Sequence, residues 1–247
     1  MDIGAFTPFF HAFRERETIN DIMEKTCGAR LTMNYMVPGG VMQELHPDFQ
    51  KDVKAFIQLF KSKVHEYDEM VTGNIIFQNR MKGVGFLSKE EAISFGCTGP
   101  TARGSGVSCD IRKLYPYDVY SKVQFDEVIE TAGDSLARYM VRIKELHQSI
   151  RIIEQLIDNI PEGDFQAKTK AVLKLPKGEF YTRVETARGE FGVYIVSEGG
   201  TTPYRIKFRS PGFSNLSALD TMARGEKLGD LVAMMGTLDL VIPDIDR

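Results

Sequence analysis

The sequence has no tryptophan, only three cysteines and only four histidines among its 247 residues. The cysteines, Cys27, Cys97 and Cys109, are odd in number and form no C-x-x-C pair, which favours a reducing compartment and argues against a structural zinc site. The histidines are scattered and form no H-E-x-x-H pattern. We therefore expect no metal site in this chain.

Long apolar runs and an excess of charge of one sign are also missing. No window approaches the roughly 18 uncharged apolar residues of a transmembrane helix, and the N-terminus has no signal-peptide pattern. The formal net charge of −3 gives no electrostatic reason to expect binding to nucleic acid. A content of 43% hydrophobic and 26% charged residues is ordinary for a globular protein, so we expect one without a membrane span.

The spacing of the apolar residues predicts helices over most of the chain. Thr7 followed by Pro8 is a typical helix start, and helical spacing continues from there to Gly28. Ser88, with Glu91 three residues later, predicts a capping box at the start of another helix. By the same reasoning further helices are predicted over 53–73, 74–81, 89–95, 125–160 and 213–237.

The pattern changes after Leu175, where aromatic and β-branched runs are separated by glycine and proline. Such runs predict a small antiparallel meander. The predicted fold class is α+β, mostly α, with a long-helix bundle and the meander near the C-terminus. We divide the chain into a helical-bundle domain over 1–175, with a glycine-rich loop at 96–120, and a small α/β C-terminal domain over 176–247.

The most informative segment is Thr98-Gly-Pro-Thr-Ala-Arg-Gly-Ser-Gly-Val-Ser-Cys-Asp-Ile-Arg-Lys113, which mixes glycines and a proline with charges. Its glycines allow positive φ or close backbone approach. Arg103, Asp110 and Arg112 are expected to form a buried network, with the carboxylate between the two guanidinium groups. The order of glycines fits neither phosphate-binding pattern, so a structural loop is the simplest interpretation of these residues alone.

This segment resembles the D-type subunit family of the bacterial NADH:quinone oxidoreductase, respiratory complex I, whose pattern is roughly GPxxRxSGxxxDxRK. Other motifs of that family occur in the same order along the whole chain: Asp2-Ile-Gly-Ala-Phe-Thr-Pro-Phe-Phe10, Gly28-Ala-Arg30, Pro38-Gly-Gly-Val41, Gly133-Asp134, Gly189-Glu-Phe-Gly-Val-Tyr194, Pro211-Gly-Phe213 and Asp246-Arg247. The resemblance implies a hydrogenase-like polypeptide that forms part of the quinone site.

The resemblance also assigns roles to single residues. Asp2, otherwise a plausible helix cap, matches an acid that lines the inner end of the quinone chamber and exchanges protons with a histidine of an earlier segment. Phe10 and Val241, otherwise core residues, match positions in the wall of the chamber. Asp246 and Arg247 match a terminus that turns inward to where related nickel–iron hydrogenases hold their metal. No nickel is expected here.

In this family the substrate is a quinone, ubiquinone or menaquinone, while NADH, FMN and the iron–sulfur clusters belong to partner subunits. The implied partners are other peripheral-arm subunits, namely the one with the terminal iron–sulfur cluster and the C-type subunit, together with the membrane subunit of the quinone tunnel. The implied location is peripheral, on the cytoplasmic face of the bacterial inner membrane.

The chain also departs from the family. The family's opening segment, with a histidine turn and a tyrosine that bind the quinone headgroup, has no counterpart, so the chain resembles the C-terminal two thirds of the family. The family's helix ahead of the meander is missing too, because only residues 164–175 separate the last long helix from the strands. The alternative is a non-catalytic scaffold fragment or a paralogue from a membrane-bound hydrogenase-type complex.

Overall fold

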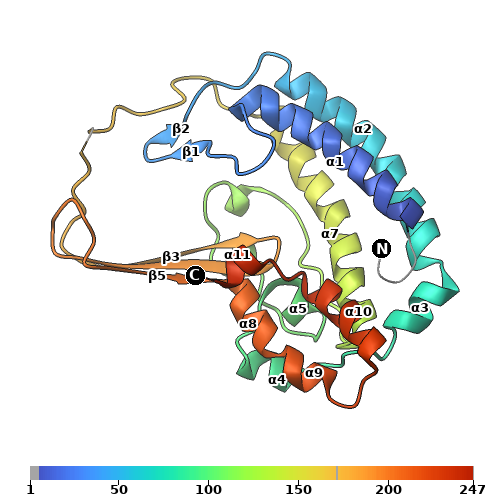
Figure 1. Ribbon diagram of the computed structural model, residues 1–247. Coiled ribbons are helices and arrows are strands. Elements are labelled where there is room, and N and C mark those ends of the chain that lie inside the picture. Colours follow the sequence, from blue (N-terminus) through green and yellow to red (C-terminus); the bar gives the residue numbers. More distant parts are fainter. Residues whose placement is uncertain (1–5, 171, 247) are drawn as a thin grey trace.

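The computed structural model describes residues 6–170 and 172–246. Helices make up most of its regular structure, and a three-stranded antiparallel sheet lies near the C-terminus, so the α+β prediction is confirmed (Figure 1). The first half contains α1 (Phe6–Cys27), β1 (Met36–Val37), β2 (Gly40–Val41), α2 (Phe49–Tyr67), η1 (Asp68–Thr72), α3 (Ile75–Met81), α4 (Lys89–Ser94), α5 (Gly99–Arg103), α6 (Ile111–Leu114) and η2 (Tyr120–Lys122). The second half contains α7 (Ser135–Leu156), β3 (Gly178–Thr186), β4 (Gly189–Ser197), β5 (Arg205–Arg209), α8 (Pro211–Ser217), α9 (Leu219–Ala223), α10 (Leu228–Leu238) and α11 (Ile242–Ile245).

Three long helices, α1, α2 and α7, form the bundle that the apolar spacing predicted. One face of each helix contributes to a shared core of Ile22, Val53, Ile57, Val64, Ile150 and Ile157. Lys25 of α1 also donates to Asp52 of α2 at 2.6 Å. The predicted helix over 53–73 is present as α2 and its π-helical continuation η1, which ends at Thr72.

Helix starts follow local capping chemistry. The predicted capping box is present, because Ser88 accepts from the backbone of Glu91 while the Glu91 carboxylate accepts from the backbone of Ser88. The prediction for 125–160 was wrong at its start, since α7 begins only at Ser135. Asp134 caps that helix by accepting from the backbone N–H of Ala137 at 2.8 Å.

Gly133 explains why the helix does not extend further back. Its φ is +70°, and a Cβ at this position would lie 2.5 Å from the carbonyl oxygen of Leu87. The preceding residues, 123–132, run along α7 without helical structure. There the Gln155 side chain binds both the backbone N–H and the carbonyl of Gln124.

Two further predictions need correction. The segment 96–120 is not purely loop, because α5, α6 and the start of η2 lie within it. The predicted helix over 213–237 is three helices, α8, α9 and α10, since Gly225 adopts φ +82° and interrupts the path between α9 and α10.

The meander is confirmed, with strand order β3-β4-β5 and antiparallel pairing throughout. A second core combines residues from both sides of residue 175: Leu87, Ala92, Cys97, Ala102, Ala218, Met222, Met234 and Leu238. The two parts of the chain therefore share one core, and the division into two domains at 175 stays a prediction.

We expect the isolated chain to bind a hydrophobic dye, because α1 presents a stripe of phenylalanines to solvent. Phe6, Phe9, Phe10 and Phe13 are each at least 40% exposed, and exposed apolar patches promote association. Replacing all four by serine should lower the dye fluorescence of the chain by about half without loss of helical circular dichroism.

Phe125, which is 2% exposed, provides the matched control. Phe125→Ser should raise dye fluorescence by loosening the core. Equal fluorescence of the wild type and the four-serine variant would show that the α1 stripe is not the exposed patch that matters.

Candidate functional site

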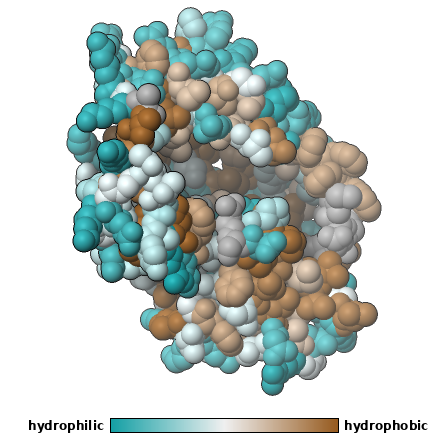
Figure 2. Space-filling view, turned by 60° about the vertical axis from the view of Figure 1, so that its left-hand side comes forward, coloured by the Kyte–Doolittle hydropathy of each residue, from teal (hydrophilic) through white to brown (hydrophobic). Residues whose placement is uncertain are grey.

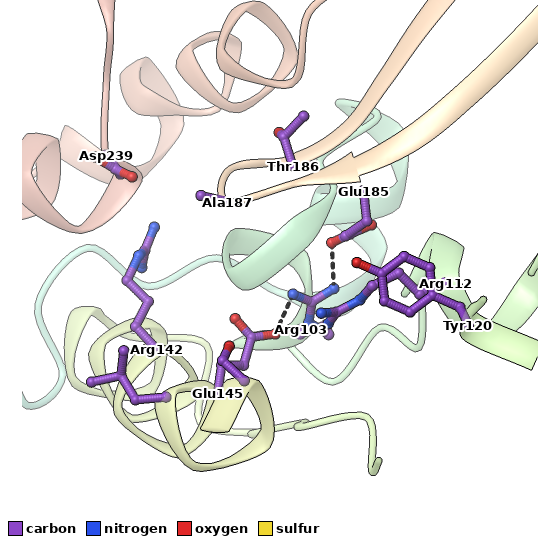
Figure 3. A pocket seen from close by; sticks show the side chains of 11 residues that line it. Arg103, Arg112, Tyr120, Arg142, Glu145, Glu185, Thr186, Ala187 and Asp239 are labelled. Atoms are coloured by element: carbon purple, nitrogen blue, oxygen red, sulfur yellow. Dashed lines mark hydrogen bonds and ion pairs between the residues drawn. The ribbon is translucent and has the colours of Figure 1, made fainter. Parts of the chain in front are cut away.

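Arg103 is the centre of a buried ion network that joins three distant parts of the chain. The side chain is 1% exposed. It donates from Nη1 to Glu185 Oε1 at 2.9 Å and from Nη2 to Glu145 Oε1 at 2.5 Å (Figure 3). Because Arg103 ends α5, Glu145 lies on α7 and Glu185 lies on β3, the network holds the sheet against the bundle.

The predicted pairing of Arg103 with Asp110 was wrong. Asp110 accepts instead from Arg112, with Nε donating to Oδ1 at 2.9 Å and Nη2 donating to Oδ2 at 2.7 Å. Asp110 also caps α6 by accepting from the backbone N–H of Arg112. The carboxylate therefore satisfies a neighbour two residues away, and Arg103 finds its partners 42 and 82 residues further along the chain.

A cavity of about 370 Å³ lies beside this network. We call it the arginine–glutamate cavity; its walls are Arg103, Arg112, Tyr120, Arg142, Glu145, Leu146, Ser149, Glu185, Thr186, Ala187 and Asp239. In Figure 3 the side chain of Arg142 extends from α7 toward Asp239, with Glu145 on the same helix closer to Arg103. Arg142 Nη1 donates to the carbonyl oxygen of Arg138 at 2.9 Å. The cavity thus collects charges of both signs.

Burial shifts the proton affinities of these groups. Burial raises the pKa of Glu185 above its usual value, and the opposing charge of Arg103 only partly offsets this effect. Burial also lowers the pKa of Arg142. At Asp110 burial acts in the same upward direction, but the hydrogen bonds and charge of Arg112 outweigh it and lower the pKa. Glu185 is therefore better suited than Asp110 to take up a proton.

Two glycines let the loop and the sheet come close enough for this network. Gly99 has φ +65°, and a Cβ there would lie 2.5 Å from the backbone of Arg188 and Gly189. A Cβ at Gly189 would clash with Thr98 Oγ1. The turn between β3 and β4 therefore rests directly on the start of α5, as expected from the glycines of the loop.

The same turn holds the C-terminal segment. Arg188 Nε donates to the carbonyl oxygen of Asp239 at 2.9 Å, and its Nη2 lies 3.3 Å from Asp239 Oδ1. Asp239 ends α10 in the left-handed conformation, with φ 54°. Val241 follows two residues later and is half-buried, while Asp246 is exposed.

The remaining predicted site residues lie apart from the cavity or outside the described part of the chain. Phe10 is 61% exposed on α1, and no contact given for the described residues joins it to Val241. Asp2 and Arg247 lie outside the described residues. The structure thus brings Arg103, Asp110 and Arg112 to one place, although not with the predicted pairing.

Sequence reasoning missed Arg142, Glu145 and Glu185. A signal was present in α7, where the charged residues Arg138, Arg142 and Glu145 recur at helical spacing between apolar residues and therefore share one face. For Glu185 no local signal distinguishes it from an exposed strand residue. Over residues 6–170 and 172–246, no group of three or more His, Cys, Asp or Glu side chains could hold a metal ion. Nor is any helix in those ranges both long and apolar enough to cross a membrane.

Comparison with known proteins gives a match over the whole chain. Residues 2–175 and 165–247 match the family described as the 49 kDa subunit of the respiratory-chain NADH dehydrogenase. The C/D subunit of the NADH-quinone oxidoreductase of Bacteroides thetaiotaomicron is 56% identical over all 247 residues, which cover 47% of that protein. A D-type subunit of the same enzyme from Solibacter usitatus is 47% identical, with 67% of it covered. The D-type subunit of Bacillus cytotoxicus is 44% identical, with 68% covered. The chain spans about half the length of the C/D relatives that it matches.

We expect Arg103→Ala to lower the free energy of unfolding by about 3–5 kcal/mol, because it leaves Glu145 and Glu185 without their cation in a buried site. Urea unfolding followed by circular dichroism measures this loss. Arg151→Ala is the control, since its ion pair with Asp126 is exposed and its removal should cost about 0–1 kcal/mol. Equal losses in the two variants would contradict the central role of Arg103.

The two shifted carboxylates should respond to pH in opposite directions. Asp110 has a lowered pKa, so its contribution to stability is present above its usual pKa of 3.8 and is lost as pH falls through the folded value. Glu185 has a raised pKa, so its favourable contribution is present below 4.5 and is lost as pH rises through the folded value.

Accordingly, Asp110→Asn should destabilise the protein at neutral pH, and its difference from the wild type should shrink in acid. For Glu185→Gln, stability relative to the wild type should rise as pH increases from 4.5, because the amide stays neutral. Urea unfolding at a series of pH values tests both trends, and parallel curves for the two variants would refute the assignment.

Proposed function

Because the chain belongs to the family of the 49 kDa subunit of the respiratory-chain NADH dehydrogenase, we propose that it forms part of the quinone-reduction chamber of a redox-driven, proton-translocating NADH:quinone oxidoreductase. The observation that carries this proposal is the match along the whole chain, at 44–56% identity, to proteins named as the D or C/D polypeptide of that enzyme. The function belongs to the assembled complex, in which this chain is one part.

The proposed quinone chamber involves both ends of the chain. Phe10 is exposed on α1 and is available as an apolar wall, and Val241 is half-buried beside the C-terminal segment that Arg188 holds. Figure 2 shows a hollow in the face of the molecule turned toward the viewer, with hydrophobic residues at its floor and rim. An apolar hollow of this kind suits the tail of a quinone, which needs little more than exclusion of water.

Proton delivery is the second part of the proposal. Reduction of a quinone to a quinol takes up two electrons and two protons, so acid groups must lie near the headgroup. We assign the first role to Asp2 and a supporting role to the arginine–glutamate cavity. There Glu145 and Glu185 share the cation Arg103, and the raised pKa of Glu185 suits it to hold a proton.

The electrons are proposed to come from the terminal iron–sulfur cluster of a partner subunit, while NADH and FMN bind elsewhere in the complex. The proposed neighbours are that subunit, the C-type subunit and the membrane subunit of the quinone tunnel. The C/D relatives carry both letters in one protein, which supports close contact with a C-type partner. The proposed location is peripheral, at the cytoplasmic face of the inner membrane.

In the complete complex, Asp2→Asn should lower quinone reductase activity by about one to two orders of magnitude while assembly stays normal. Asparagine has nearly the shape of aspartate but cannot release or accept a proton near neutral pH. The measurement is NADH:quinone reductase activity of complexes purified at normal subunit content.

Asp220→Asn is the matched control, because this aspartate is 77% exposed on α9 and pairs with its neighbour Arg224. That variant should keep wild-type activity. Wild-type activity of Asp2→Asn would remove Asp2 from the relay. Normal assembly combined with full activity in variants of Asp2, Phe10 and Val241 would instead favour a scaffold role.

A further inference from the structure

Residues 161–170 and 172–177, which lie between α7 and β3, form an exposed strap along one side of the molecule (Figure 1). The strap is fixed near both ends. At its start the backbone N–H of Val41 donates to the carbonyl of Phe165 at 3.1 Å and that of Ala167 donates to the carbonyl of Gly39 at 2.9 Å, which holds it to the β1–β2 hairpin. At its end the N–H of Leu175 donates to the carbonyl of Gly200 at 3.2 Å. The strap is thus held in place while most of its side chains face solvent.

The strap is strongly basic in a chain of net negative charge. Four lysines, Lys168, Lys170, Lys174 and Lys177, are exposed, and no acidic residue lies between Phe165 and Gly178. Five lysines elsewhere, Lys25, Lys54, Lys61, Lys63 and Lys144, each pair with a carboxylate. No ion pair in the described part of the chain involves the four strap lysines. Their charge is therefore available to an external anion.

Apolar side chains lie within the same exposed surface. Val172 is 61% exposed and Leu173 is 49% exposed, between the two pairs of lysines. On the adjoining hairpin, Met36 is 84% exposed. Lysines that flank exposed aliphatic side chains are typical of a surface that lies on a lipid bilayer, with ammonium groups at the headgroups and apolar groups just beneath.

The strap is also where the chain departs from its family. The family match is divided into two parts, 2–175 and 165–247, and both breaks fall within the strap. The family's general role therefore does not account for this segment.

We propose that the strap binds the anionic headgroups of a lipid bilayer and thereby holds this chain at the membrane surface. The inference rests on the proposed peripheral location and adds the segment responsible for it. Binding to headgroups requires charge without a fixed geometry, which suits four lysines on long flexible stems. Each lysine near an anionic surface strengthens binding about fivefold, so four together give roughly several hundredfold.

The experiment is flotation of the full 247-residue chain, cleared of aggregates, with vesicles of phosphatidylglycerol and phosphatidylcholine in equal parts. The strap variant replaces Lys168, Lys170, Lys174 and Lys177 by glutamine. The control variant replaces four exposed lysines elsewhere, Lys51, Lys89, Lys122 and Lys227, by glutamine. Both variants change the net charge equally, so a difference between them reports the position of the charge.

We expect the strap variant to lose at least about a hundredfold in affinity and the control variant to change by about twofold or less. Binding of the wild type should fall with added salt. Val172→Ser with Leu173→Ser should weaken binding at every salt concentration. Vesicles of phosphatidylcholine alone measure any binding through the exposed phenylalanines of α1, which is independent of lipid charge.

Equal binding by the two lysine variants would overturn the proposal, as would failure of the wild type to bind anionic vesicles. Strap lysines protected from acetylation in detergent-purified complex, free of lipid, would assign the strap to a protein interface instead and would also overturn it. Quinone reductase activity of the strap variant in detergent separates this inference from the proposed function. Loss of vesicle binding with full activity in detergent supports the strap as the membrane contact.

Discussion

Arg103 is the side chain on which the arrangement of this protein depends. A guanidinium group that is 1% exposed must be neutralised where it lies, and the two carboxylates that do so come from α7 and β3. The sheet, the loop that follows α4 and the bundle therefore have to meet at one point. Gly99 and Gly189 supply the close approach that this meeting requires. The cavity beside the network exists because these charged groups hold its walls in place.

The fold could be predicted wherever the determining signal was local. Helical spacing placed α1, α2 and α3, and the capping box of Ser88 placed α4 to within a residue. The prediction was wrong at the start of α7, where an apolar pattern continues back through residues that are not helical. There the backbone of Gly133, packed against Leu87, decided the structure. That contact joins residues far apart in the sequence, and no local pattern records it.

The same distinction applies to the site. The sequence indicated that Arg103, Asp110 and Arg112 belong to an ordered network, and they do. Its pairing was not predictable, because a buried arginine selects its partners through the tertiary fold, and Glu145 and Glu185 are ordinary residues of a helix and a strand. The roles of Asp2, Phe10 and Val241 came from family resemblance and stay predictions. Of these three, the described residues include Phe10 and Val241.

The β3–β4 turn has a mechanical consequence. Within four residues it contains Glu185, which is bound to Arg103, and Arg188, which is bound to Asp239 at the base of the C-terminal segment. A protonation change at Glu185 weakens the grip of α5 on one side of a short, stiff hairpin. Because Arg188 belongs to the same hairpin, the displacement reaches the tail without any intervening side chain. The turn would then act as a rigid lever, converting the charge state of one carboxyl group into the position of the C-terminal segment.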